Sequence, residues 1–242
     1  MTTQPSLQPN SVHLWVKELD ISSDAEERAF STLSEDEKIR ANKFKFPIHR
    51  KRFIAARSGL RDILSLYLNI TPHSLVFGYS EHRKPFLQSP GQDKLQFNLA
   101  HSDEIALYAI GLNQAIGVDI EKIQSTYDEA VAARFFSQDE NIALQSQPKE
   151  TQHAAFYRVW ARKEAIVKAE GKGLSIPLSS FSVTLMNNIQ TIHLNHDSWT
   201  LYPIPDYPSF EAALVCRHPI SSILFWKINE DGYELNRRIE FN

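Results

Sequence analysis

The sequence predicts an α+β protein made of two similar α/β halves. Two amphipathic helical segments, residues 53–64 and 156–167, share an Ala-Arg pair, and strand-like segments follow each of them. The 242 residues are enough for two halves of about 110 to 120 residues each. We therefore expect the halves at 1–111 and 112–242, related by a pseudo-twofold axis, with a ligand-binding groove between them.

The first half begins with a loose tail of ten residues, followed by a strand at 13–16. Ser34 and the three acids after it predict the start of a helix. A second helix runs from residue 50 to about residue 68, before Thr71-Pro72 breaks the pattern. Strands at 75–77, 97–99 and 105–110 complete this half, with a polar turn at 81–85 and a loop at 89–91.

The second half begins with a strand at 116–120. Helical patterns cover 128–136, 138–145 and 151–170, and the glycines of residues 171–173 (GKG) end the last one. The remaining strands are expected at 181–185, 191–194, 199–202, 211–216 and 223–227. We expect the C-terminal residues to pack back on the first half.

The composition is that of an ordinary globular protein, with 42% hydrophobic and 23% charged residues. The net charge of −3 argues against a nucleic-acid partner, which usually requires a basic excess. The longest apolar stretch, 105–112, is far shorter than the roughly 18 residues needed to cross a membrane, and the polar N-terminus lacks a secretion signal. We therefore expect a cytoplasmic protein. The single cysteine, Cys216, lies in an apolar run typical of a buried structural thiol.

Two acids, Asp119 and Glu121, alternate with apolar residues around the strand predicted at 116–120. In a strand their side chains point to one face, about 6.5 to 7 Å apart. Two carboxylates this close repel each other unless a cation lies between them. The alternative is a solvated acidic face with Lys122 as its partner.

The helix predicted at 151–170 presents Glu164 and Lys168 one turn apart, at the edge of its apolar face. Lys163 falls inside that apolar face, where a lysine is unexpected. Its ammonium either extends to solvent along its own alkyl chain or reaches an anionic partner in a cleft.

Glu164 completes a set of three carboxylates with Asp119 and Glu121. Oxygen ligands suit Mg²⁺, with Mn²⁺ as an alternative, and no His/Cys cluster has the spacing of a zinc site. A serine hydrolase is disfavoured because His101 has no accompanying nucleophile elbow, and residues 171–173 are too short for a P-loop. The pattern therefore predicts metal-dependent chemistry on a phosphorylated ligand.

Four segments together resemble the surfactin-synthetase type of 4′-phosphopantetheinyl transferase. They occur in the family's order and spacing at residues 97–102 (FNLAHS), 117–121 (GVDIE), 134–137 (RFFS) and 160–174 (WARKEAIVKAEGKGL). The resemblance covers roughly residues 12–228 and is tightest over 97–182. It implies that family's fold and the transfer of the phosphopantetheine arm of coenzyme A to a serine of an apo carrier protein, with release of adenosine 3′,5′-bisphosphate.

The resemblance also implies roles for the candidate residues. Asp119, Glu121 and Glu164 would hold Mg²⁺ on the coenzyme A diphosphate. Glu164, or a water that it orients, would accept the serine proton, while Lys168 would contact the phosphates. Glu164 and Lys168 are therefore the expected catalytic residues.

His101 and Lys84, the latter in a Lys-Pro pair, are further expected contacts to coenzyme A, and Arg40 and Arg52 align more loosely as basic contacts. Two positions depart from the family pattern. Ala100 stands where many relatives carry serine, and Glu37 stands where some carry a basic residue.

An apo acyl or peptidyl carrier protein is the implied partner of a monomeric enzyme, in fatty acid, polyketide or nonribosomal peptide synthesis. Because carrier proteins are typically acidic, we expect a local basic or apolar docking patch, with Phe135, Phe136 and the region 128–145 as candidates. Two other classes are possible. One is a non-catalytic module that binds coenzyme A or the carrier, and the other is a metal-dependent phosphohydrolase.

Overall fold

Helices and strands are mixed along residues 4–88 and 94–241, the part of the chain that this computed structural model describes. The helices are α1 (Ser23–Thr32), α2 (Glu35–Ala41), α3 (Pro47–Leu68), α4 (Glu129–Phe135), α5 (Gln138–Gln145) and α6 (Lys149–Glu170). The strands are β1 (Ser11–Glu18), β2 (Phe77–Tyr79), β3 (Pro85–Leu87), β4 (Leu95–Ser102), β5 (Ile105–Leu112), β6 (Ile116–Lys122), β7 (Gln190–Leu194), β8 (Asp197–Ile204), β9 (Phe210–Cys216), β10 (Ser222–Asn229) and β11 (Gly232–Glu240). The predicted α+β class is confirmed.

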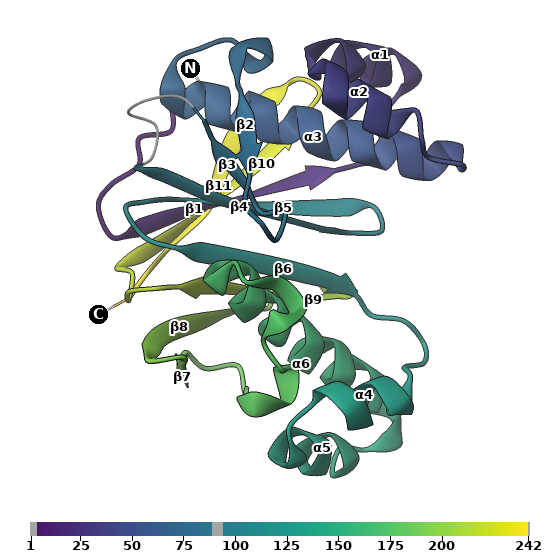
Figure 1. Ribbon diagram of the computed structural model, residues 1–242, viewed down its shortest axis with the longest axis vertical. Coiled ribbons are helices and arrows are strands. Elements are labelled where there is room, and N and C mark those ends of the chain that lie inside the picture. Colours follow the sequence, from purple (N-terminus) through teal and green to yellow (C-terminus); the bar gives the residue numbers. More distant parts are fainter. Residues whose placement is uncertain (1–3, 89–93, 242) are drawn as a thin grey trace.

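The strands form two main sheets that face each other, with helices on the outside (Figure 1). The first sheet has the order β11-β10-β1-β5-β4, the second has the order β6-β9-β8-β7, and β2 and β3 form a separate hairpin. Helices α1, α2 and α3 lie over the first sheet, and α4, α5 and α6 lie on the far side of the second (Figure 1). β1 pairs in parallel with β10, so the C-terminal strands belong to the same sheet as the first strand.

Three apolar layers hold these elements together. The central layer lies between the sheets and includes Leu14 of β1, Val118 of β6 and Leu214 of β9. Alternate residues of the same strands point outward, because side chains in a strand alternate between its faces. Trp15 thus packs in the layer under α3, and Val215 packs in the layer under α6.

Most predicted helices and strands form close to their expected positions, but one strand prediction is wrong. Residues 181–185 follow a 3₁₀ turn at Leu178–Ser180 and join no sheet. Side chains satisfy the backbone of this segment instead. Glu140 accepts the Val183 N–H at 2.7 Å, and Lys163 donates to the Phe181 carbonyl at 2.7 Å. The alternation of apolar and polar residues, on which the strand prediction rested, does not indicate such side-chain partners.

Other differences concern elements with weak patterns. Helix α1 and strand β11 were not expected, and β11 is largely exposed, so it lacks the apolar alternation of a half-buried strand. The described part of the expected loose tail lies against the protein, where Pro5 is buried and Leu7 packs with the layer under α3. The loop expected at 89–91 lies outside the described residues. The pseudo-twofold axis and the boundary between residues 111 and 112 stay predictions.

Candidate active site between the sheets and helix α6

Strand β6 presents Asp119 and Glu121 toward α6. Val118 and Ile120 take the opposite face and pack between the two sheets, so the acids are left on the helix side. Asp119 is only 3% exposed, and Glu121 is half-buried. The alternative of a solvated acidic face paired with Lys122 is wrong, because the Lys122 ammonium binds two other carboxylates. These belong to Asp103 and Glu104, at 2.8 and 2.7 Å.

Gly117 allows β6 to lie directly against α6. A Cβ atom at this position would come within 2.1 Å of the Ala165 carbonyl oxygen and 2.4 Å of the Ala169 nitrogen, which no side chain can do. This close approach brings the second strand residue after it, Asp119, next to the helix. There Lys168 Nζ donates to Asp119 Oδ1 at 2.5 Å.

Lys84 ties the β2-β3 hairpin to the two elements that carry the acids. Its Nζ donates to the carbonyl oxygens of Ile116 at 3.1 Å, Lys168 at 2.6 Å and Ala169 at 3.3 Å. Burial lowers the pKa of Lys84 to about 8, an effect that Glu170 partly opposes. The ammonium therefore bridges the start of β6 and the C-terminal end of α6. Its expected role as a coenzyme A contact stays a prediction.

The three candidate metal ligands lie close enough to repel one another. Burial raises the pKa of Asp119, Glu121 and Glu164, and the Asp119 charge raises the pKa values of the other two further. Glu121 reaches a pKa of about 7. Asp119 Oδ2 is buried and has no hydrogen-bond partner among the described residues. Positive charge would stabilise this cluster of buried carboxylates, and Lys168 supplies part of it.

The carboxylates do not form a ready-made metal centre. Among residues 4–88 and 94–241, no group of three or more His, Cys, Asp or Glu side chains has an arrangement that would hold an ion. The Lys168 ammonium faces Asp119 instead. The acids share one region with Lys168, but their oxygens do not converge on a single point.

Three basic residues that the sequence singled out, His101, Arg40 and Arg52, lie near one another beside these acids. His101 lies near the end of β4, where partial burial lowers the pKa of its ring, and the nearby charges of Lys168, Arg40 and Arg52 lower it further. Arg40 is exposed at the end of α2. The Arg52 guanidinium is already paired, with Asp20 at 2.7 Å and with Asp103, so its expected contact to coenzyme A stays a prediction.

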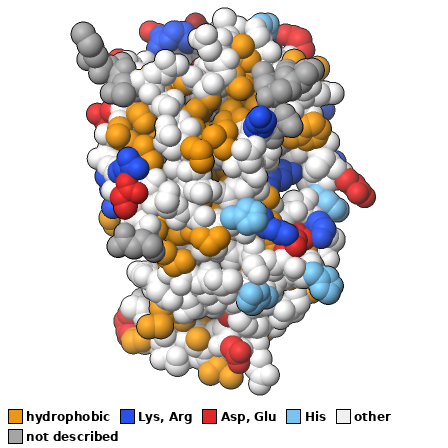
Figure 2. All heavy atoms as spheres, turned by 90° about the vertical axis from the view of Figure 1, so that its left-hand side faces the viewer, with side chains coloured by type: hydrophobic (Ala, Val, Ile, Leu, Met, Phe, Trp, Pro, Cys, Tyr) orange, Lys and Arg blue, Asp and Glu red, His pale blue; other side chains and the backbone are white. Residues whose placement is uncertain are grey.

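A cavity of about 270 Å³ lies on the Glu164 and Lys168 side of this cluster. The turn of the hairpin lines it with His82 and Arg83, β4 contributes Asn98, and α6 contributes Glu164 and Lys168. Figure 2 shows Lys, Arg and His side chains gathered at mid-height, where the two sheet-and-helix units meet. A cavity lined by one carboxylate and several cations, with two further acids close by, suits a metal-bound phosphate ligand.

Two family models match the chain. The model of the 4′-phosphopantetheinyl transferase superfamily matches residues 115–212, and a second model, 4′-phosphopantetheinyl transferase, N-terminal, matches residues 21–111. The 4′-phosphopantetheinyl transferase Sfp of Bacillus subtilis is 32% identical, over 82% of this chain and 88% of Sfp. The chain belongs to the 4′-phosphopantetheinyl transferase superfamily. Within that family, HetI of Nostoc sp. is 41% identical over 70% of this chain and 73% of HetI.

Two charged residues of this phosphopantetheinyl transferase chain turn out to be structural. Lys163 is fully buried and pairs with Glu140 at 2.8 Å, so it neither extends to solvent nor reaches the cavity. Glu37, the departure from the family pattern, is buried between Arg57 and Arg61, with ion pairs of 2.6 and 2.7 Å. It therefore pins α2 to α3. In the sequence, Glu37 and Glu140 each follow a helix-capping residue by three positions. This spacing was the only signal for their structural roles.

Other residues of the site had no separate sequence signal. Asn98 Oδ1 accepts the Val118 N–H at 2.9 Å and so fixes β4 to β6. Ser102 Oγ donates to Glu121 Oε2 at 3.1 Å. Phe136, a candidate docking residue, is only 3% exposed and packs against Phe156, so its expected role at a docking surface is wrong.

Proposed function

We propose that the protein transfers the 4′-phosphopantetheine arm of coenzyme A to a serine of an apo acyl or peptidyl carrier protein and releases adenosine 3′,5′-bisphosphate. The observation that carries this proposal is the clustering of Asp119, Glu121 and Glu164 with Lys168 beside the cavity. Fatty acid, polyketide and nonribosomal peptide synthases depend on such a modification. A panel of apo carrier proteins would identify which pathway is served.

The three carboxylates supply the oxygen ligands that Mg²⁺ prefers, with Mn²⁺ as an alternative, once their side chains turn toward one ion and Lys168 releases Asp119. A cation among them would satisfy the unpartnered Asp119 Oδ2. It would also offset the burial that raises the pKa values of all three acids and the Asp119 charge that raises those of Glu121 and Glu164 further. When bound, Mg²⁺ would neutralise the diphosphate charge and polarise the phosphorus under attack. Lys168 would then offer its ammonium to the phosphates rather than to Asp119.

The remaining roles follow from position and charge. Glu164 lines the cavity, and its raised pKa makes it a stronger proton acceptor for the attacking serine hydroxyl, directly or through a water. His101 and Arg40 would contact the nucleotide phosphates. Lys84 and Arg52 would add basic contacts to coenzyme A if they release their present partners. Both halves of one chain supply these residues, so we propose that a monomer is sufficient.

The decisive experiment is incubation of the protein with coenzyme A, Mg²⁺ and an apo carrier protein, followed by mass spectrometry of the carrier. We expect a mass gain of one phosphopantetheine arm, and we expect Glu164→Gln to abolish it. Breakdown of coenzyme A without a carrier would instead indicate a phosphohydrolase. Binding of coenzyme A without any turnover would indicate a non-catalytic module.

A further inference from the structure

One serine at the seam between the two sheets binds both the backbone and a carboxylate of β6. Strands β4 and β6 belong to different sheets, and each is the edge strand of its own sheet. Side chains of β4 accept N–H groups of β6. Asn98 Oδ1 accepts from Val118 at 2.9 Å, and Ser102 Oγ accepts from Lys122 at 3.0 Å. These two bonds hold the acid-bearing strand against β4.

The hydroxyl proton of Ser102 is committed to one carboxylate oxygen. While the Ser102 oxygen accepts the Lys122 N–H, its proton is donated to Glu121 Oε2 at 3.1 Å. A serine hydroxyl has a single proton, and an ionised carboxylate can only accept, so the direction of this bond is fixed. Among the residues that the structure describes, no donor binds the other oxygen, Oε1. Ser102 therefore occupies one oxygen of Glu121 and leaves the other for an ion.

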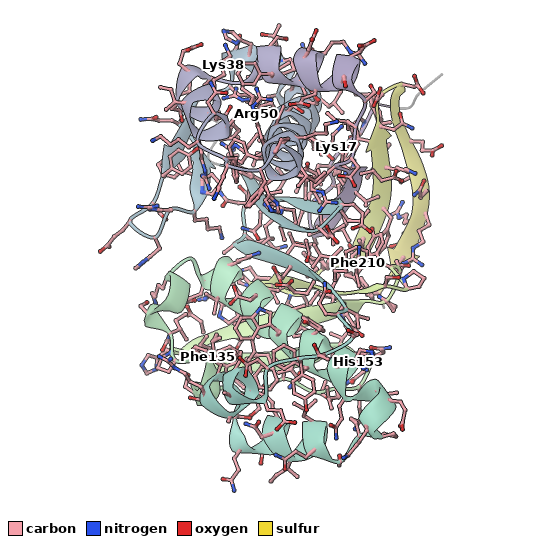
Figure 3. All side chains as sticks on the ribbon, turned by 90° about the vertical axis from the view of Figure 1, so that its right-hand side faces the viewer. Lys17, Lys38, Arg50, Phe135, His153 and Phe210 are labelled. Atoms are coloured by element: carbon pink, nitrogen blue, oxygen red, sulfur yellow. The ribbon has the colours of Figure 1, made fainter. Side chains whose placement is uncertain are left out.

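The two acids of β6 differ in how firmly one of their oxygens is held. Lys168 donates to Asp119 Oδ1, but its side chain is long and 30% exposed, so it can turn to another anion. The Ser102 side chain is short and half-buried, and Lys122 anchors its oxygen. In Figure 3, Phe210, the β9 residue opposite Lys122, lies at mid-height, where the two sheet-and-helix units meet. The Ser102 bond is thus a fixed part of this seam.

The number of oxygens that a carboxylate offers affects which ion it holds. Mg²⁺ is small and demands near-octahedral coordination, which suits carboxylates that each supply one oxygen. Ca²⁺ takes roughly six to eight oxygens in a flexible shell and accepts both oxygens of one carboxylate. Glu121 with one oxygen available therefore matches Mg²⁺, whereas Glu121 with both oxygens available would suit Ca²⁺ better.

We propose that Ser102 is a positioning residue that makes Glu121 a one-oxygen ligand and so favours Mg²⁺ over Ca²⁺ at this site. Ser102 acts through Glu121 and does not itself touch the ion. Loss of a hydrogen-bond partner of a metal ligand typically costs about 10- to 100-fold in metal affinity or activity. This inference rests on the proposed function, since it assumes that Asp119, Glu121 and Glu164 hold a divalent ion.

Calorimetric titrations of the protein with Mg²⁺ and with Ca²⁺ test the proposal. We would compare the wild type with Ser102→Ala, which removes the donor, and with Ser102→Thr, which keeps the hydroxyl. In Ser102→Ala we expect the Kd for Mg²⁺ to rise about tenfold, while the Kd for Ca²⁺ stays the same or falls. The preference for Mg²⁺ should therefore drop by about tenfold or more. Ser102→Thr should keep the wild-type preference.

The matched control is Ser182→Ala. Ser182 is also half-buried, and its hydroxyl donates to Ser137 Oγ at 2.8 Å, just before α5. Both serine-to-alanine variants lose one hydrogen bond and can lower the melting temperature, but Ser182→Ala should leave both Kd values unchanged. Amide hydrogen exchange of Lys122, followed by nuclear magnetic resonance, should accelerate only in Ser102→Ala, because the acceptor of this N–H is lost.

Equal rises of both Kd values in Ser102→Ala would show a merely structural role and overturn the proposal. If Ser102→Ala does not fold, Ser102→Cys decides, because a thiol is a weak donor of similar shape and should lower the preference in the same direction. Absence of Mg²⁺ binding by the wild type would count against the proposed function and against this inference with it. Mg²⁺ binding by the wild type, with an unchanged preference in the variants, would count against this inference alone.

Discussion

Asp119 is a buried carboxylate with one charged partner and one unpartnered oxygen. Lys168 donates to Oδ1, and Oδ2 has no hydrogen-bond partner among the described residues. A buried charge of this kind costs stability unless a cation or further donors compensate it. Its presence beside two further acids is best explained by a ligand that brings positive charge to the site.

Replacement of this charge should separate activity from stability. We expect Asp119→Asn to lower the transfer rate by at least about a hundredfold, because one ligand to Mg²⁺ is lost. The melting temperature should not fall, because a desolvated charge is removed and Lys168, whose side chain is 30% exposed, can turn to water. Calorimetry should show weaker Mg²⁺ binding.

The matched control is Glu104→Gln, which removes an acid that pairs with Lys122 outside the cluster. It should leave transfer and Mg²⁺ binding unchanged. Full activity of Asp119→Asn would contradict the metal role of this residue.

At the scale of elements, the site depends on how closely β6 approaches α6. Gly117→Ala would place a methyl group 2.1 Å from the Ala165 carbonyl oxygen, so the strand and the helix must move apart. We expect a loss of about 1–3 kcal/mol in the free energy of unfolding, together with a large loss of transfer. Chemical denaturation and the carrier mass assay measure the two effects.

Gly111→Ala is the control for this substitution. Its Cβ would meet its nearest neighbours at 3.6 Å, an ordinary van der Waals distance. The variant should therefore unfold and react like the wild type. Equal effects of both substitutions would mean that general strand propensity, rather than contact with α6, explains the result.

Lys84 is the second residue that fixes the position of β6 against α6. We expect Lys84→Met to remove donors from three carbonyl oxygens, lower the free energy of unfolding by about 1–3 kcal/mol and reduce kcat, with little change in KM for coenzyme A. The control, His82→Ala, changes an exposed residue of the same hairpin and should preserve stability. A rise in KM alone, with stability unchanged, would show that Lys84 contacts coenzyme A directly.

At the scale of the whole molecule, the two sheets share a core and the chain returns to its first sheet at the end. β10 pairs with β1, and Trp226 of β10 stacks on Trp15 of β1 with ring centroids 5.1 Å apart. Among residues 4–88 and 94–241, no helix has the length and apolar character needed to cross a bilayer. The candidate site combines residues of β4 and the β2-β3 hairpin with residues of α6.

This pairing predicts that the expected N-terminal half does not fold alone. A fragment of residues 1–111 would lack β10 and β11, so the β1 edge and the ring of Trp15 would be exposed. Near-ultraviolet circular dichroism of the fragment should show no fixed aromatic environment. A cooperative thermal transition of the isolated fragment would contradict this expectation and support an autonomous first half.

Much of this protein could be predicted from local patterns. Helix α6 and strands β6 and β9 follow from the spacing of apolar residues, because burial on one side of an element leaves a period in the sequence. The ordered motifs around Asp119 and Glu164 indicated the family for a similar reason, since they place fixed side chains at fixed intervals along such elements.

Tertiary structure alone decided which charges meet. The sequence does not show that Lys163 pairs with Glu140 or that Lys84 binds carbonyl oxygens of α6. It also does not show which lysines and arginines of the segment 38–61 have acidic partners. Long charged side chains carry no periodic signal, and their partners lie far away in the chain, as for Lys84 and Ala169 or Lys227 and Glu18. Chain periodicity therefore determined the elements and the candidate acids, and packing between distant segments determined which groups are free to bind a ligand or a partner.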